Sequence, residues 1–86
     1  MRPDDIRAHL HKHPFTPIRV FASDGSFYDV VHHDFMLVSR SEVIIGLSRS
    51  PDEIPEKKAY LDPVHITRIE PINGEQLGAD HEPTRR

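Results

Sequence analysis

IRVFASDGSFYDVV, residues 18–31, is the stretch of sequence that decides the fold. Its first half has the period of a strand that buries one face, with Ile18, Val20 and Ala22 alternating with Arg19, Phe21 and Ser23. Asp24-Gly25 then supplies the strongest short hairpin signal in the chain. In the following strand, 26–31, one face carries Tyr28 and Val30, and the other carries Phe27, Asp29 and Val31. The stretch therefore predicts an antiparallel β-hairpin.

Shorter apolar segments after this hairpin predict further strands. Residues 35–39 and 43–47 flank the polar turn 40–42 and are expected to form the third and fourth strands. Residues 49–57 contain two prolines and five charged side chains, which is typical of a surface loop. Beyond the loop, 58–61 is a weaker candidate for the start of the next strand, 65–67 fits one helical turn, and 68–72 fits a short final strand.

A short helix is expected before the hairpin. Asp4 or Asp5 can cap its first turn, and Ile6 and Leu10 fall four residues apart on one face. Pro14 ends it. Because a helix of about two turns is marginal on its own, we expect its apolar face to dock on an open edge or end of the β-structure.

These elements predict a mainly β (α+β) fold. A short N-terminal helix precedes a five-stranded, strongly bent antiparallel sheet or a small SH3- or Sm-like barrel, and periodicity does not separate the two. One domain is expected over residues 1–73, since a chain of 86 residues has room for a single small core. Residues 74–86 are polar with few apolar anchors, so we expect a disordered tail.

The composition excludes several kinds of site. The chain has no cysteine, which removes disulfides, thiolate metal ligands and cysteine nucleophiles. Its formal net charge is −3 and its 11 basic residues are scattered, which disfavours tight nonspecific nucleic-acid binding. Without a Gly-rich phosphate loop, a nucleophile elbow or HExxH, we expect no enzyme and no cofactor. No apolar run resembles a signal peptide or a membrane span, so we expect a cytoplasmic location and no membrane partner.

Four blocks of sequence carry a resemblance: PFTPIRV at 14–20, DG at 24–25, VHHDF at 31–35 and VHITRIEP at 64–71. They resemble a family of small uncharacterised bacterial proteins with the pattern PF.PF.I…DG..F.V.HPEF…HI..IEPL. His33 stands where that family usually has proline. The resemblance covers about residues 4–72 and implies the domain limits, but it implies no activity.

The order of elements is also similar to that of the Sm-like/Hfq family, whose members form rings that bind RNA. The matches in type and order are Asp24-Gly25, Phe35, Ile66-Thr67 and Ile69 to Pro71. The family's Lys-His pair falls on Pro63-Val64, and the aspartate of its first motif falls on His33. The similarity therefore implies a fold and transfers no RNA-binding residue.

Histidines form two candidate metal clusters. His9 and His13 share a face if the helix continues that far, which makes at most a weak two-ligand site. A solvated helix end, where histidine is favourable to the helix dipole, is the simpler expectation. The run His32-His33-Asp34 lies between two strands, where neighbours on an extended chain point apart, so a capping role is the simpler expectation. His65 would have to approach from the final turn to complete a His-Asp-His set. The weak metal candidates are thus His32, His33, His65, His9 and His13, and no bound metal is expected.

Phe21, Phe27 and Val31 alternate onto the expected outer face of the hairpin. Exposed aromatic side chains there can pair with another chain or stack on bases. Packing of these side chains under the helix is the more frequent arrangement. We therefore expect a noncatalytic interaction domain that binds a protein partner or itself as a homo-oligomer, through a strand edge or this face. The alternatives are an Sm-like ring that binds RNA and a weak histidine-based metal-binding protein.

Overall fold

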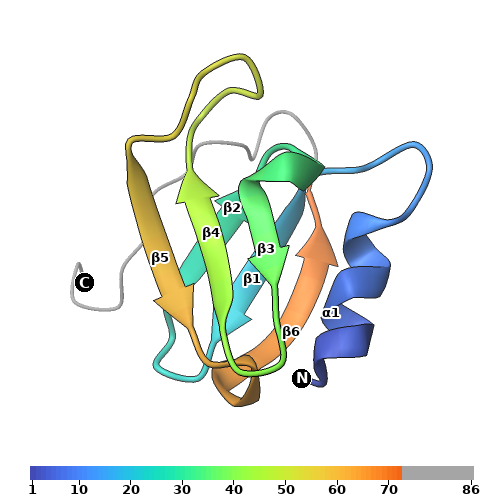
Figure 1. Cartoon of the computed structure of the whole chain (residues 1–86), viewed down its shortest axis with the longest axis vertical. Coiled ribbons are helices and arrows are strands. Elements are labelled where there is room, and N and C mark those ends of the chain that lie inside the picture. Colours follow the sequence, from blue (N-terminus) through green and yellow to red (C-terminus); the bar gives the residue numbers. More distant parts are fainter. Residues whose placement is uncertain (73–86) are drawn as a thin grey trace.

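The structure is a computed structural model, and it describes residues 1–72. Its elements are α1 (Pro3–Leu10), β1 (Ile18–Ala22), β2 (Phe27–Val30), η1 (His33–Phe35), β3 (Met36–Val38), β4 (Val43–Leu47), β5 (Lys57–Leu61), η2 (Pro63–His65) and β6 (Ile66–Pro71), where η marks a 3₁₀ turn. Within these residues the strands form two three-stranded antiparallel sheets, ordered β2-β1-β6 and β3-β4-β5, with no closed barrel. Figure 1 shows the two sheets stacked, with α1 along one side and the two 3₁₀ turns at opposite ends.

The expected mainly β fold with an N-terminal helix is confirmed, but the five-stranded sheet or barrel is corrected. Residues 57–61 form a full strand, which raises the number of strands in the described chain to six. The chain passes from one sheet to the other at η1, between β2 and β3, and returns at η2, between β5 and β6. Two separate sheets form because these short turns redirect the chain where a single bent sheet would need continuous strands.

The hairpin predicted from residues 18–31 is confirmed. Gly25 has φ 93°, a left-handed conformation that glycine adopts without strain. The Asp24 carboxylate accepts hydrogen bonds from the Ser26 amide (3.0 Å) and hydroxyl (2.6 Å), and these bonds lower the pKa of Asp24. The register places Phe21 opposite Phe27 and Val20 opposite Tyr28. The residues of the turn and the alternation of buried and exposed side chains therefore favour the same pairing of β1 with β2.

The helical turn near the last strand lies two residues earlier than predicted. It spans 63–65 instead of 65–67, and β6 consequently begins at Ile66 instead of Arg68. The Asp62 side chain caps the turn by accepting a hydrogen bond from the Val64 amide at 2.9 Å. Pro63 occupies the first position of the turn, where its missing N–H costs nothing.

The core lies between the two sheets and under the helix. Its central cluster is made of eight buried apolar residues from α1 and from five of the strands: Ile6, Ile18, Val20, Val30, Met36, Val43, Ile45 and Ile66. The inward side chains of β1 and of β4 belong to this one cluster. In its own sheet, β1 pairs with β2 on one side and with β6 on the other. The domain therefore depends on few side chains, as expected for its size.

The helix docks as predicted, but it is capped differently. Ile6 is fully buried, and Leu10 packs against the core cluster. Arg2 occupies the cap position without a side-chain bond, so neither Asp4 nor Asp5 is the cap. Both aspartates lie in the first turn, where negative charge is favourable to the helix dipole. The Met1 amino group donates to the carbonyl oxygens of Pro63 (2.8 Å) and Ile66 (2.7 Å), which ties the start of the chain to η2 and β6.

Two further expectations from the sequence concern the C-terminal tail and membrane spans. The predicted disorder of 74–86 lies outside the described residues. Over residues 1–72, no helix has the length and apolar character needed to cross a membrane.

Truncation of the buried helix residue should show how strongly the domain depends on helix docking. We expect Ile6→Ala to lower the free energy of unfolding by about 2–5 kcal/mol, the usual cost of removing a fully buried isoleucine side chain. Urea unfolding followed by circular dichroism measures this change. Ile54→Ala, at a residue that is 89% exposed, is the matched control and should change stability by less than about 0.5 kcal/mol.

Candidate functional site

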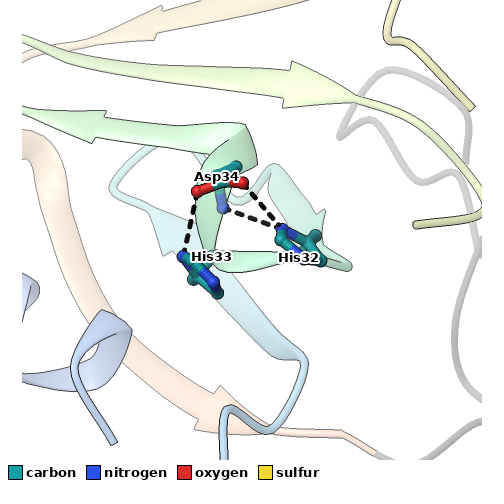
Figure 2. A group of neighbouring side chains, drawn as sticks. All are labelled: His32, His33 and Asp34. Atoms are coloured by element: carbon teal, nitrogen blue, oxygen red, sulfur yellow. Dashed lines mark hydrogen bonds and ion pairs between the residues drawn. The ribbon is translucent and has the colours of Figure 1, made fainter. Parts of the chain in front are cut away.

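The turn η1 brings His32, His33 and Asp34 together (Figure 2). One ligand atom of each residue lies within 4.8 Å of those of the other two. His33 Nδ1 is 3.1 Å from Asp34 Oδ1, and His32 Nδ1 is 3.7 Å from Asp34 Oδ2. The expectation that these neighbours point apart is wrong, because the chain leaves the extended conformation after His32 and curls into a 3₁₀ turn.

The expected capping role at this turn is confirmed for His32. Its Nδ1 accepts a hydrogen bond from the Asp34 amide at 3.1 Å, so this nitrogen carries no proton in that bond. The imidazoles of His32 and His33 stack with centroids 4.4 Å apart. Phe35 lies 5.6 Å from the His32 ring, and Phe15 lies 6.0 Å from the His33 ring. Aromatic neighbours therefore border both imidazoles.

His65 does not join this cluster. It belongs to η2, at the opposite end of the domain from η1 (Figure 1). Its Nδ1 lies 3.3 Å from the Ser23 hydroxyl in the β1–β2 hairpin. The proposed His-Asp-His set is therefore not assembled.

The pair at the end of the helix is not assembled either. Because α1 ends at Leu10, His13 lies beyond it and shares no helix face with His9. In residues 1–72, the one group of three metal-type ligands is the η1 cluster. Partial burial is the main cause of a lowered pKa for His9; Lys12 adds to the lowering, and Asp5 opposes it.

The predicted aromatic face lies on sheet β2-β1-β6, where its own arginines cover it. The rings of Phe21 and Phe27 are 5.8 Å apart. The Arg68 guanidinium lies 3.7 Å from the Phe21 centroid, and that of Arg19 lies 4.2 Å from the Phe27 centroid. Val31 does not share this face: the strand ends at Val30, and Val31 is buried at 5% exposure.

Carboxylates on the same face pair with these arginines. Arg19 donates two hydrogen bonds to Asp29, from Nε at 2.7 Å and from Nη2 at 3.0 Å, and these bonds raise the pKa of Arg19. Arg68 Nε donates to Glu70 at 2.8 Å. Each arginine is thus bonded to an acid and stacked on a ring, which reduces the apolar surface offered to a partner.

Sequence reasoning missed an apolar row on the other sheet. Leu37, Ile44 and Tyr60 face one another across β3, β4 and β5 on the outer side. Leu37 is 63% exposed and Tyr60 is 57% exposed. Alternation within each strand indicates that these residues share a face, but only the register shows that they form one row.

At the next outward position of β4, a loop residue covers the sheet. A Cβ atom on Gly46 would lie 2.8 Å from Pro55 Cγ, so this glycine lets the loop 48–56 rest on the strand. The covered part of the outer face therefore ends next to the exposed row.

Three arginines that are scattered in the sequence line one crevice. Arg2 and Arg7 of the helix region meet Arg40 of the β3–β4 turn, and Asp4 lies among them. None of the three arginines forms an ion pair with another residue in 1–72. The structure therefore creates a positive patch that the linear distribution of charge did not indicate.

The chain was compared with protein-family models, curated proteins and solved structures, and it matches none of them. The resemblances to the small bacterial family and to the Sm-like family therefore stay predictions.

The lowered pKa of His9 should make stability depend on pH. The folded state resists protonation of His9 more than the unfolded state does, so stability falls as pH decreases through the ordinary histidine pKa of 6.5. We expect the melting temperature of His9→Gln to fall less than that of the wild type between about pH 7.5 and about pH 5.5. Equal decreases in the two proteins would contradict this assignment.

Proposed function

We propose that this domain is a noncatalytic interaction module that binds a second copy of itself through the edge strand β5. The observation that carries the proposal is an exposed aromatic side chain, Tyr60, on an edge strand, in line with the apolar row of its sheet. An edge strand offers unpaired N–H and C=O groups to another strand. Tyrosine adds a large contact area at low conformational cost.

The sequence of β5 favours one register for antiparallel pairing with its copy. Residues opposite each other in such a pair point to the same face, so the symmetry axis passes through a residue of the strand. The three central residues of β5, Lys58, Ala59 and Tyr60, give the longest overlap of the two strands. An axis at Lys58 opposes two lysines, and an axis at Ala59 places Glu56 opposite the partner's Asp62. An axis at Tyr60 instead places Lys58 opposite the partner's Asp62, twice by symmetry. Charge complementarity therefore supports the axis at Tyr60.

This register also extends the exposed apolar row. The two Tyr60 rings meet at the axis, and Ile44 and Leu37 continue the row on each side. Two three-stranded sheets then become one six-stranded sheet. Self-association of this kind adds buried surface to a domain whose own core is small.

A charge exchange across the pairing strands tests the proposal. We expect the wild type to dimerise, and Lys58→Asp to raise the dimer dissociation constant by about tenfold, because each opposite-charge pair contributes about 0.2–1 kcal/mol and like charges repel. The double variant Lys58→Asp/Asp62→Lys should restore the wild-type constant. Sedimentation equilibrium at several protein concentrations measures these constants.

The controls distinguish a variant that no longer dimerises from a variant that no longer folds. Ile54→Ser removes an apolar side chain that is exposed outside the row, and it should leave dimerisation unchanged. Because Asp62 also caps η2, thermal unfolding of each variant must show a folded protein. A wild type that stays monomeric, or a double variant as weak as Lys58→Asp, would reject this interface. A hexamer or heptamer would favour the Sm-like ring.

The arginine crevice supports a second candidate, the binding of RNA through its phosphates. Arg2, Arg7 and Arg40 present guanidinium groups, which suit phosphate oxygens. We expect Arg7→Ser to weaken binding of a labelled single-stranded RNA. The slope of the logarithm of the binding constant against the logarithm of the salt concentration should also become shallower by about one, which corresponds to the loss of one phosphate contact. Lys12→Ser, which removes a charge outside the crevice, is the control. Absence of RNA binding by the wild type at low salt excludes this function.

A further inference from the structure

We propose that η1 binds a divalent transition-metal ion through His32, His33 and Asp34. Two imidazoles and one carboxylate suit Zn²⁺, Ni²⁺ and Cu²⁺ better than Mg²⁺ or Ca²⁺, which prefer oxygen ligands. The proposal concerns a site separate from the pairing strand and does not rest on self-association.

The spacing of the ligand atoms carries the proposal. Ligand atoms about 2.0–2.2 Å from a tetrahedral zinc ion lie about 3.3–3.6 Å from one another. In the structure, His33 Nδ1 lies 3.1 Å from Asp34 Oδ1, and His32 Nδ1 lies 3.7 Å from the other carboxylate oxygen, Oδ2. All three ligand atoms lie within 4.8 Å, so small side-chain rotations bring them to bonding distance. Figure 2 shows one nitrogen of each ring facing a different oxygen of the Asp34 carboxylate.

The surroundings hold these side chains near that arrangement. The η1 turn is closed by the Phe35 amide, which donates to the His32 carbonyl at 3.0 Å. Contacts with Phe35 and Phe15 restrict the two imidazoles. A site whose ligands are already oriented loses less conformational freedom when it binds an ion.

Access and charge also favour an ion. Each of the three side chains is at least partly exposed, so water can fill the remaining coordination positions. Among residues 1–72, no lysine or arginine pairs with the Asp34 carboxylate, so none needs to be displaced. The ion would take the His32 Nδ1 lone pair from the Asp34 amide, which water can then solvate.

Zinc titration of protein freed of metal by a chelator tests the site. Calorimetry with ZnCl₂ gives the affinity, and NMR of the histidine rings identifies the ligands. We expect His32 and His33 resonances to shift. We expect His33→Ala and Asp34→Asn each to weaken binding by at least about tenfold, since even outer-shell partners of metal ligands contribute about 10- to 100-fold.

Two variants serve as matched controls. His65→Ala removes an imidazole at the opposite end of the domain, and His9→Ala removes one on the helix; both should bind zinc like the wild type. Circular dichroism checks that every variant is folded. The proposal is overturned if the wild type shows no zinc-dependent shift, if His33→Ala binds as tightly as the wild type, or if the shifted resonances belong to His9, His13 or His65.

Discussion

The inward row of β1 is the constraint on which the rest of the domain depends. Ile18 and Val20 meet the buried side chains of the opposite sheet, and β1 alone in its sheet has a paired strand on both sides. Because side chains alternate along a strand, burying these residues commits Arg19 and Phe21 to the outer face. One hydrophobic row thus fixes both the packing of the two sheets and the chemistry that the first sheet presents.

The outer faces of the two sheets differ in how far their apolar side chains are covered. On β2-β1-β6, aromatic rings are covered by arginines that are themselves bonded to carboxylates, so the groups satisfy one another. On β3-β4-β5, Leu37 and Tyr60 stay exposed and Ile44 is partly buried; within residues 1–72, Pro55 covers the neighbouring position by resting on Gly46. Exposed apolar surface of this kind marks interaction sites in small soluble domains. This contrast between the faces is why we propose self-association through the second sheet.

Sequence periodicity predicted the parts of the fold that periodicity controls. The alternation around Asp24-Gly25 gave the correct hairpin, and 43–47 is a strand with the predicted bounds. The larger errors in element boundaries lie at the two 3₁₀ turns, because a three-residue turn depends on a single cap, His32 or Asp62, and has no period to detect. The cluster His32-His33-Asp34 was singled out from the sequence, but the apolar row and the arginine crevice were missed for a related reason. The apolar row requires the register of three strands, and the arginine crevice requires the packing of the helix against a distant turn.

The position of β1 between β2 and β6 has a consequence for how the chain acquires its structure during synthesis. β1 pairs with residues close to it in sequence on one side, but on the other side it pairs with 66–71, the last strand described. The amide of Ile72 closes this pairing by donating to Pro17 at 2.9 Å. A nascent chain on the ribosome therefore lacks one side of its central strand until β6 has emerged. Until then, the free edge of β1 offers unpaired N–H and C=O groups with which other nascent chains can mispair.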